Sequence, residues 1–514
     1  MKGAHPYSGR AVKGGMVIFI AGRGLSGVLT FIAFGLAARL LPLAEYGHYA
    51  AALAVMEVAL AVSTGGLDWV TARLVPDARV HASGRATGAA VLRLAALQGM
   101  LVAAVACVVY AGADELARLM KLPAAAPAFH LVAPLVLAEG LGRLARDQML
   151  TVLMAQRAGQ MAQLLRVGTL LALLLWTWRQ DASLEAAAML HLELTAAACA
   201  AVAGSLALAL VLWRLRTVPA ADPHWQAPGG LRRLAMHTYA SYLLSLLCGP
   251  QVLTMVVARM LGADAAGAFG FARTFADQVR RYLPTDLLQS IVRPTLVAYY
   301  SATREFAGLS LRAGLLMKSA AAVLFPLLVF FTAFGDLGMR ALGGVRFAPA
   351  WPVLVVLLCG AGTTAWRRVV ELCANTVLES GLVARANAAL AVLPLVMVAA
   401  LQATGSLVLA AALPVLAEAL FCLRVQAGLR ARGYQSPADG AGWLRLAAGL
   451  LVCVPLALLH AAHPLPLAVA VVLAGLAALL ALRMVRLINA SEGALVATWN
   501  GRLARLIGAA PQPA

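Results

Sequence analysis

Charged side chains are scarce in this sequence. Only 12% of its 514 residues are Asp, Glu, Lys or Arg, whereas soluble domains average about a quarter. Hydrophobic residues make up 62% of the chain, and a soluble protein of this length could not bury so much apolar surface. The composition therefore excludes a soluble globular protein and predicts a polytopic membrane protein built of spanning helices.

Cysteine motifs and acidic residues are also few. All seven cysteines fall within apolar runs and none forms a CxxC pair, so neither a disulfide framework nor a zinc site is expected. Lys and Arg number 41 against 22 Asp and Glu, which gives a formal net charge of +19. Membrane proteins retain Lys and Arg on cytoplasmic loops. We therefore interpret the excess as a sign of topology and expect no nucleic-acid partner.

Apolar stretches long enough to cross a hydrocarbon core of about 30 Å recur along the chain. The first runs from Gly15 to about Ala38. It is too long for a signal-peptide core and no A-x-A site follows it, so we expect a permanent span. Hydropathy predicts about fourteen spans, with limits near 15–38, 48–72, 89–111, 129–154, 160–178, 186–212, 236–260, 267–292, 312–334, 351–374, 386–403, 407–427, 444–461 and 465–482.

The short linkers between these spans alternate in charge. The N-terminus carries Lys2, Arg10 and Lys13. If it lies in the cytoplasm, most of the remaining basic linkers fall on the same side, and the positive-inside rule then predicts that both termini are cytoplasmic. The linker residues placed inside are Arg73, Arg79, Arg85, Arg214, Arg216, Arg232, Arg233, Arg304, Arg430, Arg432, Arg483 and Arg486.

The sequence repeats itself at an offset of 220 residues. ARLLPLAEYGHYA at 38–50 aligns without a gap with ARMLGADAAGAFGFA at 258–272, and the same offset brings Glu57 onto Asp277. A second similarity, at an offset of 222, brings Arg146 onto Arg368. With six spans in each repeat both halves enter the membrane in the same orientation, as in parallel-repeat transporters.

These repeats predict two six-helix lobes followed by two extra helices. After the last span, ALVATWNGRLARLIG has the apolar spacing of a helix that lies on the inner membrane surface, although a frayed tail is an open alternative. The predicted organisation is an N-lobe at 1–213, a cytoplasmic linker at 214–233, a C-lobe at 234–430, extra spans at 431–485 and a cytoplasmic amphipathic tail at 486–514.

The repeated loops carry a resemblance to a known family. ARLLPLAEYGHYA followed by VSTGGLDWVTARLVP resembles the first hairpin of the Wzx-type polysaccharide-repeat flippases of the MOP superfamily. ADAAGAFGFARTFADQV is similar to their second-half turn, which leads into Ala-x-Arg, and RFAPAWPVLVVLL is similar to the segment that opens their tenth span. The resemblance covers nearly the whole chain.

The resemblance implies an all-α, MATE-like, two-lobed fold and a transporter, not an enzyme. The implied cargo is an undecaprenyl-pyrophosphate-linked oligosaccharide, the repeat unit of a polysaccharide, O-antigen or exopolysaccharide. It would be flipped across the bacterial inner membrane by alternating access, with no cofactor and with proton or sodium coupling. Its partners would be the lipid-linked glycan, the phospholipid bilayer, and a polysaccharide polymerase or glycosyltransferases. The family arginine carried over is Arg273 in the Ala-x-Arg.

The intramembrane arginines are the main candidates for a substrate site. In FARTFADQVRRYLP, Arg273, Asp277, Arg280 and Arg281 follow i, i+4, i+7 and i+8 and so share one helix face. One carboxylate cannot neutralise three guanidinium groups, and guanidinium binds phosphate oxygens bidentately. We therefore predict a pyrophosphate-binding site, with further contributions from Arg23, Arg146, Lys318 and Arg368.

Each of these residues also has a plainer interpretation. Arg280 and Arg281 could extend to lipid head groups at the end of their helix. The spacing of Arg367, Arg368 and Glu371 also suits a helix-end salt bridge. The alternative for Arg146 is an anchor in a cytoplasmic loop.

Two carboxylates at equivalent positions of the repeats are candidates for ion coupling. Asp277 has arginines one turn away on both sides, so it serves either as their counter-ion or as a titrating group. Glu57 has no basic residue three or four positions away, and this favours it as the proton or cation site.

Two other functions stay open at this point. A MATE-type, cation-coupled exporter of small molecules is favoured by Glu57 and Asp68, but Arg23 in the first span would repel a cationic substrate. An integral membrane glycan ligase or acyltransferase would need a sizeable outer loop, and every predicted outward loop is short. His460 and His463 lie at a short turn, where we expect no acidic partner.

Overall fold

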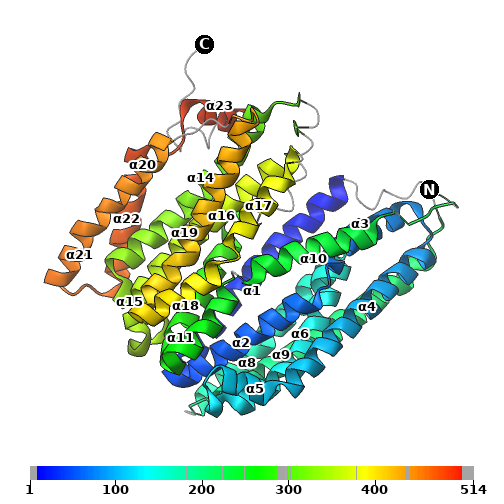
Figure 1. Ribbon diagram of the computed structural model, residues 1–514, viewed down its shortest axis with the longest axis horizontal. Helices are drawn as coiled ribbons and strands as arrows, with labels where there is room; N and C mark the ends of the chain where they lie inside the picture. Colours follow the sequence, from blue (N-terminus) through cyan, green and yellow to red (C-terminus); the bar gives the residue numbers. More distant parts are fainter. Residues whose placement is uncertain are drawn as a thin grey trace. The chain divides into compact units, whose positions relative to one another are not determined.

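The computed structural model describes residues 9–180, 183–220, 222, 224–227, 229–247, 249–287, 296, 299–300, 303–377, 379–435 and 440–499. Every regular element in these ranges is helical (Figure 1). Thirteen of the helical segments described are long and apolar enough to cross a membrane. The all-α, polytopic class predicted from composition is confirmed. Of the predicted amphipathic tail, residues 500–514 lie outside the described ranges.

The span count differs by one from the predicted fourteen. The predicted span at 236–260 is divided between α10 (Leu231–Leu247), which has 17 residues, and the start of α11 (Pro250–Tyr282). A helix normally needs about 20 residues to cross the hydrocarbon core. Within α11, Gly262 has φ 86° and ψ −176°, a backbone conformation that glycine adopts readily. This non-helical glycine divides α11, and the predicted arginine stripe lies in the part of α11 that follows it.

The chain forms two compact units, Met1–Gly270 (unit 1) and Phe271–Ala514 (unit 2). The boundary falls within α11, and the lobe limits inferred from the repeat stay a prediction. Before α10, unit 1 comprises α1 (Gly9–Leu40), α2 (Leu43–Ser63), α3 (Leu67–His81), α4 (Gly84–Ala111), α5 (Ala113–Leu119), η1 (Pro123–Ala125), α6 (Ala126–Arg143), the π-helix η2 (Leu144–Met149), α7 (Leu150–Val152), α8 (Gln156–Arg179) and α9 (Ala186–Leu215).

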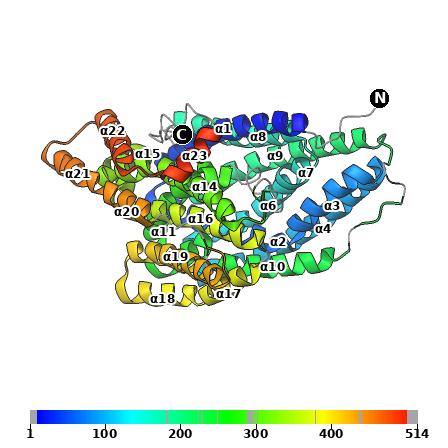
Figure 2. The same cartoon turned by 90° about the horizontal axis from the view of Figure 1, so that it is seen from above.

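In unit 1, α6 packs against α2, α4 and α9 (Figure 2). The helix faces in contact are rich in small residues: Ala51, Ala52 and Ala54 of α2 are completely buried. Small side chains let membrane helices approach closely, and van der Waals packing then stabilises the bundle. The polar side chains on these inward faces must therefore find partners inside the bundle.

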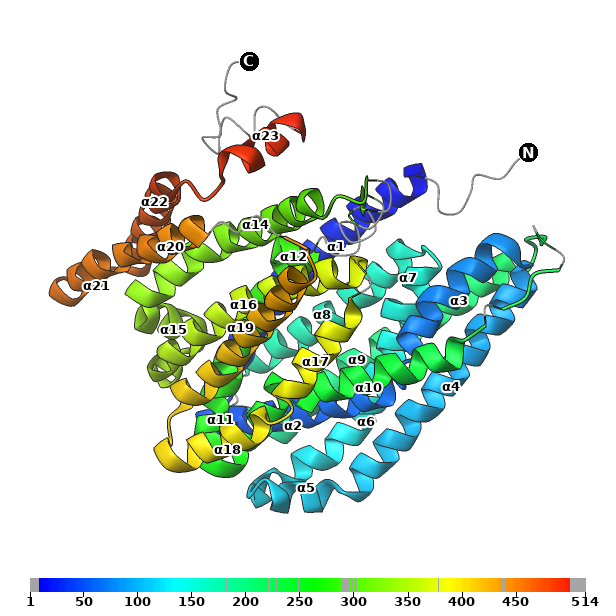
Figure 3. The same ribbon diagram turned by 45° about the horizontal axis from the view of Figure 1, so that its top comes forward.

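Unit 2 is built around α14, which packs against α16 and against the late helices α21 and α22 (Figure 3). Its elements after α11 are α12 (Pro284–Leu287), α14 (Phe306–Ala333), α15 (Gly335–Gly343), η3 (Val345–Ala350), α16 (Trp351–Thr376), α17 (Ser380–Leu390), α18 (Leu393–Thr404), α19 (Leu407–Ala431), α20 (Gly440–Gly449), η4 (Leu450–Val452), α21 (Cys453–Ala462), α22 (Leu467–Val485) and α23 (Ala490–Trp499). The two extra spans therefore belong to the same compact unit as α14.

The sequence repeat reappears as a reciprocal contact within unit 1. A Cβ atom added to Gly47 would lie 1.8 Å from the carbonyl oxygen of Ala263. One added to Gly267 would lie 2.3 Å from the carbonyl oxygen of Leu43. The 220-residue offset pairs Gly47 with Gly267 and Leu43 with Ala263, so each repeat gives the other the same contact. This exchange is the pattern of a two-fold symmetric interface.

Replacing Gly47 with alanine is expected to lower the free energy of unfolding by about 1–3 kcal/mol, the usual range for overpacking. The clash is with a backbone oxygen, which cannot rotate away as a side chain would. Thermal unfolding of the purified protein measures the effect. Gly168→Ala is the matched control, because no atom lies within 4 Å of its added Cβ. Equal melting temperatures for the two variants would contradict the close approach.

Candidate functional site

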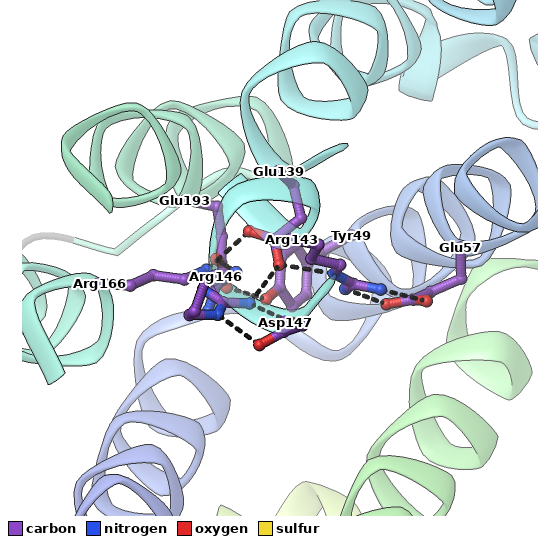
Figure 4. A network of polar contacts seen from close by, with 8 residues as sticks. All are labelled: Tyr49, Glu57, Glu139, Arg143, Arg146, Asp147, Arg166 and Glu193. Atoms are coloured by element: carbon purple, nitrogen blue, oxygen red, sulfur yellow. Dashed lines mark hydrogen bonds and ion pairs between the residues drawn. The ribbon is translucent and has the colours of Figure 1, made fainter. Parts of the chain in front are cut away.

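A network of charged side chains lies inside unit 1 (Figure 4). Glu139 on α6 and Glu193 on α9 are 4% and 9% exposed. Arg166 on α8 joins them: its Nε donates to Glu139 Oε2 at 2.8 Å and its Nη2 donates to Glu193 Oε2 at 3.0 Å. Tyr49 on α2 donates from its hydroxyl to Glu193 Oε1 at 2.9 Å. These contacts connect α2, α6, α8 and α9.

Arg143, at the end of α6, extends the network to Glu57. Its Nε donates to Glu139 Oε1 at 2.8 Å, and its Nη1 and Nη2 donate to the two oxygens of Glu57 at 3.1 and 2.8 Å. Paired, bidentate contacts of this kind are among the stronger hydrogen bonds in proteins. Glu57 thus has a basic partner 86 residues away in sequence, which its local spacing could not reveal.

Arg146 lies in the π-helix η2 and is buried. Its Nε and Nη2 donate to Asp147 at 2.8 and 2.9 Å, and its Nη2 lies 3.9 Å from Glu139 Oε1. Consecutive residues of an α-helix do not face each other, whereas π-bulges alter the register and are frequent at functional sites. Among the described residues, Arg146 Nη1 has no hydrogen-bond partner. Of the network's arginines, Arg146 therefore keeps a donor for another acceptor.

The network suits a structural role better than substrate binding. The guanidinium nitrogens of Arg143 and Arg166 already form ion pairs with carboxylates on different helices. Buried charges are tolerated when they are paired and hydrogen-bonded, and removing one partner is strongly destabilising. We interpret this network as a set of ion pairs that stabilises the packing of the helices in unit 1. Its members are Glu57, Glu139, Arg143, Arg166 and Glu193.

The arginine stripe of α11 has the predicted local geometry. Arg273 Nε lies 3.4 Å from Asp277 Oδ2, and Arg280 Nη2 lies 3.2 Å from Asp277 Oδ1. Arg273 is 14% exposed, and Arg281 is exposed. Asp277 therefore contacts two arginines at once, while the stripe as a whole carries three guanidinium groups.

The other basic residues predicted for the site have contacts of their own. Lys318 on α14 is buried, and its Nζ donates to Glu492 Oε2 on α23 at 2.6 Å. Arg368 on α16 pairs with Asp286 on α12 at 2.9 Å. Arg23 lies half-buried in α1, a helix that packs against α8. The structure thus brings Arg273, Asp277 and Arg280 together and gives Lys318 and Arg368 carboxylate partners from other helices.

The structure answers one of the plainer interpretations and the expectation about His460. Arg367 and Glu371 form an ion pair along α16, with Nε 2.9 Å from Oε1, whereas Arg368 turns to α12. His460 Nε2 lies 3.8 Å from Asp336 Oδ1. The expectation that His460 has no acidic neighbour was wrong, because Asp336 comes from α15, far away in sequence.

Sequence reasoning overlooked Arg143, Arg166 and Tyr49. A signal was present for two of them: Arg166 falls in the middle of a predicted span, and Arg143 stands four residues after Glu139. Intramembrane arginines are rare and normally have a named partner. Tyr49 lies in the repeated loop ARLLPLAEYGHYA, but no pattern there indicated the partner of its hydroxyl.

The fold is MATE-like. The chain is similar to the lipid II flippase MurJ in an inward closed conformation, with 10% identity over 90% of this chain and 98% of that one and a TM-score of 0.53. It is also similar to an inward-facing multidrug resistance MATE family transporter, with 14% identity, 81% and 98% coverage and a TM-score of 0.60. A third similar structure is a MOP superfamily transporter from Pyrococcus furiosus. It is 13% identical over 81% of this chain and 93% of that one, with a TM-score of 0.52. At such identities the likeness establishes the fold alone.

The amino-acid sequence also assigns the chain to a protein family. The model of the family described as polysaccharide biosynthesis protein matches residues 12–332, which is more than half of the chain. The chain belongs to this family. No curated protein matches the sequence. Family and fold together confirm the resemblance inferred from the repeated loops.

Proposed function

We propose that this protein flips an undecaprenyl-pyrophosphate-linked oligosaccharide across the bacterial inner membrane. Membership of the polysaccharide biosynthesis family supports a glycan cargo. The fold shared with a lipid II flippase supports a cargo carried on a lipid. The product would be the repeat unit of a polysaccharide, O-antigen or exopolysaccharide, handed to a polymerase or received from glycosyltransferases. Both termini would lie in the cytoplasm.

The observation that carries the proposal is the stripe on α11. Three arginines and one aspartate share one face of a candidate membrane span. A pyrophosphate offers several anionic oxygens to such a face, and planar guanidinium groups stay charged at any relevant pH. Hydrocarbon would not tolerate this charge, so the stripe faces protein, water or an anionic cargo.

The transport cycle that we propose uses alternating access. The inward-open protein binds the pyrophosphate at Arg273, with Arg280 and Arg281 beside it, and the glycan occupies a water-filled space. Arg23, Arg146, Lys318 and Arg368 would complete the basic lining. Of these, Arg146, Lys318 and Arg368 would first have to leave the carboxylates that they contact. Rocking of one lobe against the other would then expose the cargo to the outer side.

Glu57 and Asp277 are proposed to serve this cycle by charge compensation. Each carboxylate contacts arginine in the structure. A proton or sodium ion bound at either would compete with these guanidinium groups. Arg143 in particular would have to leave Glu57 before a cation could take its place.

Reconstitution into proteoliposomes tests the proposal. A fluorescent undecaprenyl-pyrophosphate-linked oligosaccharide should reach the far leaflet faster in vesicles that contain the protein than in empty vesicles. A neutral lipid that carries the same glycan without pyrophosphate is the matched control and should not be accelerated. Equal rates for the two lipids, or export of a small cationic dye in place of either, would contradict the proposed cargo.

A further inference from the structure

Glu418 is a membrane-embedded carboxylate with an unusual set of partners. It lies on α19, within the candidate span Leu407–Ala431. Two hydroxyl groups of α16 converge on a single one of its oxygens: Thr363 Oγ1 is 3.1 Å and Thr364 Oγ1 is 2.7 Å from Glu418 Oε2. Helices α16 and α19 pack directly against each other in unit 2.

This carboxylate differs from four others described in the spans. Glu57, Glu139, Glu193 and Asp277 all lie within ion-pair distance of arginine. Across the part of the chain that the structure describes, no Arg, Lys or His lies within that distance of Glu418. A carboxylate in a membrane span without a cationic partner is costly when ionised, and such residues mark ion and proton pathways.

The hydrogen bonds around Glu418 require one more proton than the hydroxyls supply. Thr363 Oγ1 is also 3.0 Å from the carbonyl oxygen of Gly360. Three oxygen–oxygen contacts therefore share the protons of two hydroxyls, and each hydroxyl donates only one. If the carboxyl group of Glu418 is protonated, it donates to Thr363, Thr363 donates to Gly360 and Thr364 donates to Glu418. Every contact is then satisfied.

The geometry points to Glu418 as a proton-binding site, with Thr363 and Thr364 as positioning residues. Binding takes up one proton and turns the carboxylate into a carboxylic acid, and release reverses this. Protonation removes the charge and stabilises the contact between α16 and α19, because Glu418 then forms hydrogen bonds with both threonines. After deprotonation, the Thr363 hydroxyl can donate to Gly360 or to Glu418 but not fully to both. The contact between the two helices then loses one hydrogen bond.

In the described part of the chain, no charged group on the helices packed against α19 forms an ion pair with Glu418. The helices α16, α17 and α18 pack against α19. On α16, Arg367 is engaged by Glu371 and by Asn387 of α17. The sequence of α18 contains no titratable side chain. The remaining titratable residues on the described parts of these four helices are Arg368, Cys359, Cys373, Arg385, Cys422, Arg424 and Arg430.

Use of this site to drive transport rests on the proposed function, whereas proton binding itself does not. The first measurement is therefore infrared difference spectroscopy of the purified protein as the pH is changed. A band of the protonated carboxyl group should appear on acidification and be missing in Glu418→Gln. An unchanged band in that variant would overturn the assignment of the proton to Glu418.

The second measurement uses proteoliposomes loaded with the fluorescent lipid-linked oligosaccharide. An imposed pH gradient should accelerate flipping by wild type but not by Glu418→Gln, whose amide mimics the protonated acid. Thr363→Val should weaken the response about fivefold, as expected for the loss of one hydrogen bond. Thr376→Val is the matched control and should respond as wild type does. In the described part of the chain, the Thr376 hydroxyl donates to the carbonyl oxygen of Leu372 on the same helix and to no other group.

The outcomes separate the two proposals. If the infrared band titrates and vanishes in Glu418→Gln but no glycan lipid is flipped, the proton site stands and the cargo is wrong. If flipping occurs and responds to a sodium gradient at constant pH, and no proton band is lost, the carboxylate and hydroxyl oxygens hold sodium, and the proton assignment is overturned.

Discussion

Arg273→Ala is expected to reduce flipping of the pyrophosphate-linked lipid by about 10- to 100-fold. Hydrogen bonds to charged groups contribute about 1.5–3 kcal/mol each, and each 1.4 kcal/mol is about a factor of ten in affinity. The variant should still fold, because Asp277 keeps Arg280 as a partner at 3.2 Å. The initial rate of flipping in proteoliposomes, at matched amounts of monodisperse protein, is the quantity to measure.

Two controls separate the role of the bidentate guanidinium geometry from that of the positive charge. Arg273→Lys keeps the charge but loses bidentate geometry, so its rate should fall between those of wild type and Arg273→Ala. Arg118→Ala removes an arginine whose side chain is 69% exposed on α5 and should leave the rate unchanged. A wild-type rate for Arg273→Ala would mean that the head group binds elsewhere.

Arg166→Met is expected to lower the free energy of unfolding by about 3–5 kcal/mol, the usual effect of breaking a buried ion pair. The change leaves Glu139 and Glu193 without the guanidinium group that joins them, and both carboxylates are almost completely buried. Thermal unfolding followed by size-exclusion chromatography should show a clear fall in melting temperature.

The matched control is Arg157→Met, an exposed position on the same helix, which should melt as wild type does. Adding Glu139→Gln and Glu193→Gln to Arg166→Met should recover part of the loss, because the uncompensated charges are then removed. If Arg166→Met has the same melting temperature as wild type, the network does not stabilise unit 1.

The fold could be predicted from sequence because a membrane imposes strong local rules. A spanning helix must satisfy its own backbone hydrogen bonds, so hydropathy alone locates most spans. The repeat was visible because Gly47 and Gly267 tolerate no side chain where they meet the opposite backbone. The predicted span at 236–260 falls partly in α10 and partly in α11, because hydropathy does not show where a helix ends.

Predictions of the site succeeded where the interaction is local. The i, i+4 spacing placed Asp277 against Arg273, and Glu371 against Arg367. The partner of Glu57, in contrast, comes from a helix whose register against α2 no pattern in the sequence reveals. The same holds for Lys318 and Glu492, which are 174 residues apart.

Accessibility of the α11 stripe tests the central claim most directly. Single cysteines at positions 273 and 277, in a background in which the seven native cysteines are replaced, would be labelled with a membrane-impermeant reagent from each side. We predict labelling from at least one side and protection by undecaprenyl pyrophosphate. No labelling from either side, in protein that folds and inserts normally, would show that the stripe is a buried salt-bridge cluster and not part of the cargo path.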